Sequence, residues 1–407
     1  MKYSPLTVPF IQEILNLDSG DKIKLSKEKH ITSLWAGYGE VNSIVVNCPK
    51  SKSGSTKIPL IIKRVTPPSN SSSVGNQRKI RSYHIEAYFY DTIAPSILKL
   101  NDDGILSCPI AIPYSIEKTE EDEDSPSFTF VLSDLTDEYS EYSSYPGLSI
   151  EQTKAAISWL AAFHAIFYKN NTSTSTTIDN TNIWAEGGYW HLKTRLDELA
   201  QISSSSSSSN QRMFHNSAFA IDERMNANAN SLTLVHGDFK EANILFGKEK
   251  CAVVDFQYCG RGYGAKDLVM LIVSSVSGRI LDSNSNQMGG EDGLLRFYAD
   301  ELRRNLESIG ELDSDEIEKV ASFDILKMQY ELALVDYVRF MMGWGMWGTN
   351  SDYAGERAVE ILKDIALSWS GFNDDDDGRK KSSAVAASLT EDDWTSAINE
   401  KYPLDLF

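Results

Sequence analysis

Two short apolar stretches, each ending in polar residues, constrain this chain more than any other feature. The first, residues 232–235, leads into His-Gly-Asp-Phe-Lys-Glu-Ala-Asn at positions 236–243. The second, residues 252–254, leads directly into Asp255. Both stretches contain the aliphatic and β-branched residues typical of strands. Because rigid scaffolds hold reactive groups on the loops that follow their strands, the sequence predicts a functional site here.

The spacing of Asp238, Asn243 and Asp255 is typical of phosphoryl-transfer sites, with the first two five positions apart and the third one strand later. A carboxylate can accept the proton of an attacking hydroxyl group, while an amide oxygen and a second carboxylate hold Mg²⁺ on the phosphates. Singly, such loop residues often form only turns, and His236 is best explained as a packed structural residue. The combination predicts Asp238 and Asn243 as catalytic residues, and Asn243 and Asp255 as metal ligands.

The upstream part of the chain supplies the residue types that such a site needs to bind ATP. Gly37 and Gly39 precede a β-branched run, Lys63 lies near the end of the next run, and Glu86 lies in a helical pattern. Taken singly, the glycines could be ordinary turn residues, the lysine an ordinary strand residue and the glutamate an ordinary surface residue of a helix. In this order they match the parts that hold the α- and β-phosphates in kinases. Arg64 competes with Lys63, but it should point to the opposite face of its strand.

The composition excludes several other classes of protein. Among 407 residues, 58 are acidic and 39 basic, giving a net charge of −19 that argues against nucleic-acid binding. No apolar run reaches the roughly 18–20 residues that a membrane helix needs. The four cysteines form no CxxC pair, so neither a zinc site nor a disulfide framework is expected. The amino terminus has no signal-peptide pattern, and we predict a cytoplasmic protein without membrane or nucleic-acid partners.

The pattern of strands and helices predicts an α+β protein of two lobes. We expect residues 1–135 to form a nucleotide-binding lobe, a five-stranded sheet with one helix, and residues 136–371 to form a mainly helical lobe that carries catalysis and acceptor binding. Residues 372–407 are expected to be an acidic linker and tail. The expected strands are 41–46, 59–65 and 128–132; the expected helices are 80–93, 149–168, 268 onward, 293–309, 317–342 and 391–398; polar loops are expected at 70–76, 120–124, 170–182, 203–209 and 374–377.

Taken together, these motifs resemble those of small-molecule kinases with a protein-kinase-like fold, the aminoglycoside phosphotransferase and choline kinase relatives. The resemblance is greatest to the ecdysteroid kinase-like branch and covers about residues 30–365. Residues 82–90 look like its N-lobe helix, 130–135 like its hinge, and 260–268 like the run after its magnesium-binding Asp. The resemblance implies transfer of the γ-phosphate of ATP, with Mg²⁺, to a hydroxyl of a small molecule.

Several further roles follow from the resemblance. Leu132 and Asp134 would contact the nucleotide at the hinge, and Asp267 would brace the catalytic loop. Ser133 replaces the usual hinge Glu, and the glycine loop lacks a third glycine. Lys240 is also unusual for this branch; protein Ser/Thr kinases have a Lys there, close to the transferred phosphate. We therefore include Lys240 as a catalytic candidate, with an exposed loop lysine as the alternative.

Two other functions remain alternatives to a small-molecule kinase. A pseudokinase would bind nucleotide without turnover, but the intact set of acidic and basic residues disfavours it. A protein kinase would need a long activation segment, yet Asp267 follows Asp255 by only twelve positions. The aromatic residues of the acceptor lobe suit either a cationic or a flat apolar acceptor, and each is equally well explained as core: Trp184, Tyr189, Trp190, Trp344 and Trp347. The oligomeric state is not predicted.

Overall fold

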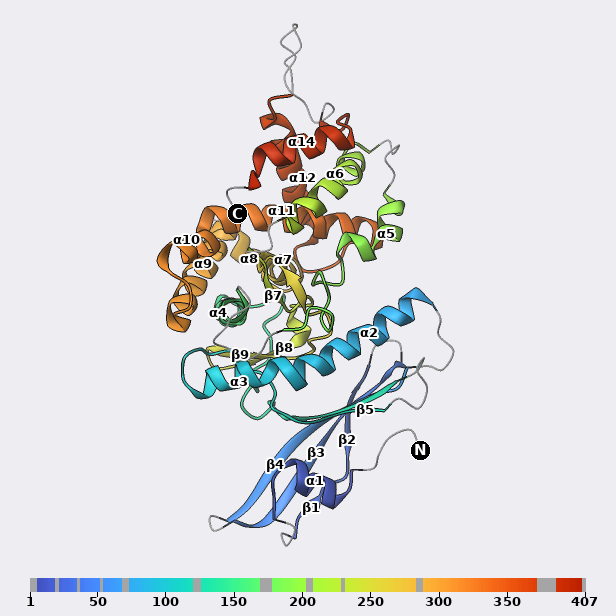
Figure 1. The fold of residues 1–407 in the computed structure, drawn as a ribbon, viewed down its shortest axis with the longest axis vertical. Coiled ribbons are helices and arrows are strands. Elements are labelled where there is room, and N and C mark those ends of the chain that lie inside the picture. Colours follow the sequence, from blue (N-terminus) through green and yellow to red (C-terminus); the bar gives the residue numbers. More distant parts are fainter. Residues whose placement is uncertain are drawn as a thin grey trace.

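The computed structural model describes most of the chain, namely residues 6–18, 22–34, 37–51, 54–67, 73–119, 126–168, 178–202, 208–227, 231–282, 288–371 and 386–404. The two acidic runs at 120–124 and 374–377, and most of the Ser-rich stretches, lie outside these residues, as do Trp35 and Ala36 of the glycine loop. An antiparallel sheet with its helices occupies one end of the molecule, and a mainly helical part occupies the other (Figure 1). The expected two-lobed α+β fold is therefore confirmed.

Within the described residues, the N-terminal sheet has six antiparallel strands in the order β1-β3-β4-β6-β5, and β2 also pairs with β3. The expectation of five strands was wrong because β2 is exposed along its whole length and shows no apolar alternation. The three strands predicted from apolar runs are confirmed as parts of β3, β4 and β6. The bounds are β1 (Lys24–Leu25), β2 (Lys29–Ser33), β3 (Gly39–Ser51), β4 (Gly54–Val65), β5 (Pro113–Thr119) and β6 (Ser127–Ser133).

Helices cover both faces of this sheet, so the expectation of a single helix was also wrong. α1 (Val8–Ile14) places Ile11 in a small core with Ile62 and other residues of one sheet face. α2 (Val74–Tyr88) packs on the other face through Tyr83. Its Ser73 cap places the start of the helix before residue 80, within the predicted Ser-rich loop. The π-helical turn η2 (Phe89–Ile93) and α3 (Ala94–Asp102) continue α2 toward the helical part.

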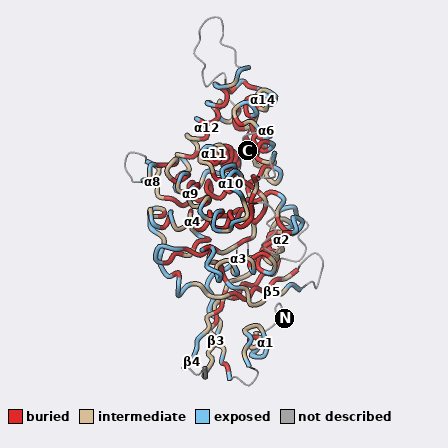
Figure 2. The backbone as a smooth tube through the Cα atoms, turned by 60° about the vertical axis from the view of Figure 1, so that its left-hand side comes forward, coloured by how far each residue is buried: buried red, intermediate tan, exposed pale blue. Residues whose placement is uncertain are grey.

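The helical part is built around three elements that are buried on most sides, α4 (Ile150–Phe167), α7 (Ala265–Ser274) and α11 (Phe323–Trp344). Figure 2 shows buried residues along and around α4 and α11. α4 begins with the predicted capping box of Ser149 and Gln152. The remaining elements are η3 (Leu192–Thr194), α5 (Leu196–Gln201), α6 (Ser209–Asn226), β7 (Thr233–Val235), η5 (Glu241–Asn243), β8 (Ile244–Gly247), β9 (Lys250–Val253), β10 (Gly260–Gly262), α8 (Gly278–Leu281), α9 (Gly290–Ile309), α10 (Ser314–Ala321), α12 (Ser351–Ser368) and α14 (Glu391–Lys401).

Two features of the helical part differ from the expectation or extend it. The single helix expected over residues 317–342 is two helices, because Ser322 ends α10 and its side chain caps the start of α11. The expected helix near residue 391 is α14, which packs on α6 and α12 with Trp394 fully buried. We retain the lobe boundaries 1–135, 136–371 and 372–407 as a proposal. Among the described residues, no helix is long and apolar enough to cross a membrane.

Candidate active site

The loop between β7 and β8 carries the predicted catalytic residues. β7 ends at Val235, the loop includes Asp238, and η5 ends at Asn243 where β8 begins. The neighbouring strand β9 is paired with β8 and runs back toward Asp255. The backbone N–H of Val254 donates to the carbonyl oxygen of Asn243 at 3.0 Å. The strand pairing therefore places the two predicted metal ligands, Asn243 and Asp255, at one edge of this small sheet.

Asp267, on the first turn of α7, holds the catalytic loop through hydrogen bonds to its backbone. Its carboxylate accepts from the backbone N–H groups of His236 at 2.7 Å and of Gly237 at 2.9 Å, and it contacts His164 Nε2 at 3.1 Å. Asp267 and His164 are fully buried. This geometry agrees with the bracing role that the resemblance implied. Sequence reasoning missed His164, although a polar residue within the apolar stretch of α4 was a usable signal.

The loop conformation requires glycine at position 237. Gly237 has φ +81°, and a Cβ there would lie 2.2 Å from the carbonyl oxygen of Tyr258. The next side chain, His236, is buried and bonded through both ring nitrogens, with Nδ1 3.2 Å from the backbone N–H of Asp238 and Nε2 3.1 Å from the carbonyl oxygen of Val254. Burial lowers the pKa of His236, so a neutral structural residue is the appropriate description.

Asp238 is buried and makes a bidentate ion pair with Lys240. Lys240 Nζ lies 2.9 Å from each carboxylate oxygen, and Asn243 Nδ2 donates to the Asp238 carbonyl at 2.9 Å and to Oδ2 at 3.1 Å. Burial raises the pKa of Asp238 to about 6, although Lys240 and Asn243 act in the opposite direction. Asp238 can therefore exchange a proton near neutral pH, as a general base must.

Lys63 joins the two lobes through charged contacts. Its Nζ lies 2.8 and 2.7 Å from the two carboxylate oxygens of Glu86 on α2, and 3.1 Å from Oδ1 of Asp255, which is 192 positions away in the sequence. Arg64 points to the opposite sheet face, as expected, and pairs with Glu28 at 2.6 and 2.8 Å. The structure thus brings together three of the predicted residues from three separate elements.

Lys63 stabilises the charge of each carboxylate, whereas the two carboxylates repel each other. Burial alone would lower the pKa of Lys63, but Asp255 and Glu86 together raise it above its ordinary value. Burial raises the pKa of Glu86 to about 7 against the opposing effect of Lys63. Burial also opposes ionisation of Asp255, yet the Lys63 ammonium outweighs it and lowers the pKa of Asp255. Lys63 and Asp255 are therefore charged at neutral pH.

The two predicted loop glycines have different surroundings. Gly37 has φ +74°, and a Cβ there would meet no atom of the described residues within 4 Å. Gly39 has φ +156°, and a Cβ there would lie 1.9 Å from the carbonyl oxygen of Arg64. Close packing of β3 on β4 is thus a sufficient reason for glycine at position 39. Of the two, Gly37 alone has no close neighbour within the described part of the chain, and nucleotide contact by either glycine stays a prediction.

The predicted hinge residues lie at the end of β6. Leu132 is buried, and the backbone N–H of Asp134 donates to the carbonyl oxygen of Pro59 at 3.2 Å. The Asp134 side chain accepts from the backbone N–H of Thr136 at 2.9 Å and from its hydroxyl at 2.7 Å. This side chain therefore orders the turn after β6, and contact of nucleotide with the backbone at Leu132 and Asp134 stays a prediction.

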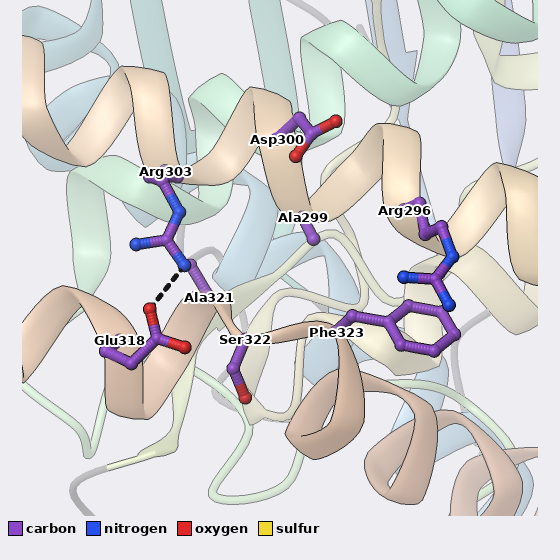
Figure 3. A pocket seen from close by; sticks show the side chains of 8 residues that line it. All are labelled: Arg296, Ala299, Asp300, Arg303, Glu318, Ala321, Ser322 and Phe323. Carbon is purple, nitrogen blue, oxygen red and sulfur yellow. Dashed lines mark hydrogen bonds and ion pairs between the residues drawn. The ribbon is translucent and has the colours of Figure 1, made fainter.

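A surface hollow between α9, α10 and the start of α11 is separate from these residues (Figure 3). Arg296 stacks on the ring of Phe323 at 3.6 Å, and Arg303 pairs with Glu318 at 2.7 Å. None of the predicted site residues lines it. Arg296, Arg303 and Glu318 already have partners, and we place the candidate active site at the β7–β8 loop and Lys63 instead. Its lining residues are Arg296, Ala299, Asp300, Arg303, Glu318, Ala321, Ser322 and Phe323.

Solved structures of small-molecule kinases are similar to this chain at low sequence identity. A choline kinase from Cryptosporidium parvum Iowa II is 11% identical, with 83% of this chain and 88% of that chain covered and a TM-score of 0.42. A Plasmodium vivax ethanolamine kinase is 11% identical, with coverages of 87% and 84% and a TM-score of 0.37. Amicoumacin kinase hAmiN, in complex with AMP-PNP, Ca²⁺ and Ami, is 12% identical, with coverages of 81% and 87% and a TM-score of 0.40.

The family is established by a sequence match that includes the candidate site. No curated protein matches the chain. The sequence model of the ecdysteroid kinase-like family matches residues 38–311, which run from the glycine loop to the end of α9 and contain Lys63, Glu86, Asp238, Asn243 and Asp255. This match extends over more than half of the chain. The chain is therefore a member of the ecdysteroid kinase-like family.

Proposed function

We propose that the chain transfers the γ-phosphate of ATP to a hydroxyl group of a small molecule in a Mg²⁺-dependent reaction. The observation that carries the proposal is the contact of Lys63 with both Glu86 and Asp255. A strand lysine fixed by a helix glutamate, next to a loop aspartate, is the arrangement that holds nucleotide phosphates in kinases. A cytoplasmic location and the absence of nucleic-acid partners stay predictions.

Asp238 is the proposed catalytic base. The acceptor hydroxyl gives its proton to the Asp238 carboxylate as its oxygen bonds to the γ-phosphorus and the bond between that phosphorus and ADP breaks. Lys240 lies beside Asp238 and can neutralise charge on the transferred phosphoryl group. Asn243 orients Asp238 through its amide N–H group. The sequence left open whether Lys240 is a catalytic residue or an exposed loop lysine. The ion pair between Lys240 and Asp238 favours the catalytic role.

The residues present fit a magnesium ion. The Asn243 amide nitrogen is bonded to Asp238, and among the described residues its amide oxygen has no hydrogen-bond partner. Lys63 contacts only one carboxylate oxygen of Asp255. No group of three His, Cys, Asp or Glu side chains in the described part of the chain could hold a metal by itself. Mg²⁺ commonly takes one or two protein oxygens plus substrate phosphates, and it would neutralise phosphate charge here.

A screen for acceptor-dependent ADP release tests this function directly. Purified protein would be incubated with ATP, Mg²⁺ and a panel of hydroxylated metabolites, and ADP would be measured with and without each compound. We expect release that depends on both an acceptor and Mg²⁺. Nucleotide binding without turnover for any member of a broad panel would instead favour the pseudokinase alternative.

Lys63 and Glu86 should act as one unit. Lys63→Ala should raise the KM for ATP and slow transfer, because the phosphates lose a fixed cation. Lys63→Arg should also be impaired, since the planar guanidinium group of arginine does not replace the compact ammonium group of lysine. Glu86→Ala should have a milder effect, and the double variant should show a coupling of roughly 0.5–3 kcal/mol in a cycle measured by kcat/KM for ATP. Purely additive losses would show that the two residues do not act together.

Lys240 should set the pH dependence of the reaction. Asp238 is active as a base only when deprotonated, so kcat/KM should fall as pH drops through the pKa of about 6. Lys240 lowers this pKa, so Lys240→Met should move the acid limb of the profile to higher pH as well as reduce kcat. Lys250→Met, which removes an exposed lysine paired with Glu138, is the matched control. An acid limb that stays in place in Lys240→Met would contradict the assigned contact.

A further inference from the structure

Four aromatic side chains form a connected cluster that begins beside the catalytic loop. Tyr189 packs edge-on against Tyr258 and Phe340, with ring centroids 5.5 Å apart in each case, and Phe340 stacks on Trp344 at 5.8 Å. Phe340 is buried, Tyr189 and Tyr258 are half-buried, and Trp344 is 56% exposed. The aromatic cluster therefore extends from the protein interior to its surface.

This aromatic cluster is joined to Asp238 through the backbone. The N–H of Gly188 donates to the carbonyl oxygen of Tyr258 at 3.2 Å, and both groups pack against Gly237, the residue before Asp238. Burial raises the pKa of Tyr258 to about 12, with a further contribution from Asp238 and an opposing one from Arg195. Tyr258 thus lies within electrostatic reach of both the proposed base and Arg195. An acceptor presented to Asp238 would lie next to this cluster.

Arg195 occupies the position where the cluster would bind a cation. Its guanidinium lies 5.9 Å from the ring centroid of Tyr189, 5.4 Å from that of Phe340 and 5.5 Å from that of Trp344. Aromatic faces at such distances are the usual receptors for ammonium groups. Arg195 Nε also donates to the carbonyl oxygen of Tyr189 at 2.6 Å, and Nη1 lies 3.2 Å from Glu198. The arginine is therefore fixed over the rings, and only 17% of its side chain is exposed.

We propose that Arg195 determines acceptor specificity by filling the cation position of the aromatic cluster, so that acceptors with an ammonium group at this position are excluded. The proposal rests on the proposed function, in which the acceptor binds next to Asp238. Sequence reasoning left a cationic and a flat apolar acceptor equally open, and the fixed guanidinium decides between them. A second cation at the same rings would be repelled, whereas an uncharged acceptor could pack against the exposed part of Tyr258, Tyr189 and Trp344.

The proposal predicts that removal of one charge creates a cation site. Arg195→Met keeps an unbranched apolar side chain and leaves the Glu198 carboxylate beside the rings. Choline and tetramethylammonium are suitable probes, observed by saturation-transfer NMR on their methyl groups. We expect binding by Arg195→Met at least about 10-fold tighter than by the unchanged protein, as an aromatic site with an unpaired carboxylate can supply. The neutral isostere of choline, 3,3-dimethylbutan-1-ol, should bind the two proteins about equally.

Matched variants separate charge from shape. Arg195→Lys keeps a cation and should show no gain, and adding Glu198→Gln to Arg195→Met should remove most of the gain. Arg304→Met, which changes an exposed arginine on α9, controls for net charge. If Arg195→Met unfolds, judged by its Tm, Arg195→Gln retains a donor for the Tyr189 carbonyl and tests the same charge. Equal affinity of choline for the variant and the unchanged protein would overturn the proposal.

The failure of this inference can be told apart from failure of the proposed function. ATP binding is measured separately by calorimetry, because the aromatic cluster includes none of the proposed nucleotide contacts. A protein that binds no ATP would refute the kinase reaction, whatever the cation result. Normal ATP binding together with no gain of choline binding in Arg195→Met would refute the role of Arg195 alone. Tight choline binding by the unchanged protein would refute it as well.

Discussion

Asp238→Asn should slow phosphoryl transfer by roughly 10²–10⁴-fold, the usual contribution of a positioned general base. The amide keeps the size of the carboxylate but cannot take the acceptor's proton. Asp238 is buried and held by Asn243 and Lys240, so a side chain of the same shape should preserve the loop. The affinity for ATP should barely change, because Lys63 and Asp255 are untouched. Single-turnover rates and calorimetric nucleotide affinity would measure the two effects separately.

A buried aspartate outside the site provides the control. Asp222 on α6 is also largely buried, and burial raises its pKa to about 7. Asp222→Asn makes the same chemical change, so it should leave the transfer rate near that of the unchanged protein. If Asp238→Asn abolished ATP binding while a bound acceptor still reacted at the normal rate, the assignment of Asp238 as the base would be wrong.

The catalytic loop could be predicted from sequence because its signal is local. Asp238, Asn243 and Asp255 lie within eighteen positions, and the strands that flank them are recognisable from their apolar residues. Lys63 was identifiable for a similar reason, since strand alternation placed it and Arg64 on opposite faces. The structure confirms that geometry, with Arg64 paired to Glu28 across the sheet.

Contacts between segments that are distant in the sequence could not be predicted from a local sequence pattern. The bond between Lys63 and Asp255 joins residues 192 positions apart, and only the order of motifs suggested it. His164 reaches Asp267 from another helix, and Arg195 reaches Phe340 and Trp344 because α5 packs on α11. These pairings depend on how helices dock, which one sequence does not reveal.

Other differences arise where local preference and tertiary context compete. β2 is exposed throughout and lacks apolar alternation, so its place in the sheet depends only on backbone pairing with β3. Ser322 lies in a run that reads as one helix, yet its hydroxyl caps the next helix instead. Gly39 resembled a phosphate-binding glycine, but contact with the Arg64 carbonyl already demands it. For β2 and Gly39 a contact with another strand decides the conformation, whereas at Ser322 a side-chain cap three residues along the chain does.

Asp255→Asn should reduce turnover by on the order of 10³-fold or more, because one substitution removes a proposed metal ligand and a charged partner of Lys63. Asparagine is the informative replacement. Asp255 has φ +70°, a conformation that Asp and Asn tolerate better than most residues, so alanine would add backbone strain to the chemical change. In the unchanged protein Mg²⁺ should tighten ATP binding, and in Asp255→Asn this gain should be largely lost. Titrations of ATP with and without Mg²⁺ would measure it.

Glu249 offers a control matched in both charge and backbone. It is an exposed carboxylate at φ +59° in the turn between β8 and β9, so Glu249→Gln repeats the carboxylate-to-amide change at positive φ. That variant should retain turnover and the effect of Mg²⁺ on ATP affinity. Excess chelator should stop the unchanged protein as completely as Asp255→Asn does. Because Lys63 would still contact the phosphates, ATP should bind Asp255→Asn weakly but measurably. Full turnover in Asp255→Asn, or in the unchanged protein with excess chelator, would contradict this assignment. It would show that phosphate charge is neutralised by groups other than a metal held at Asp255.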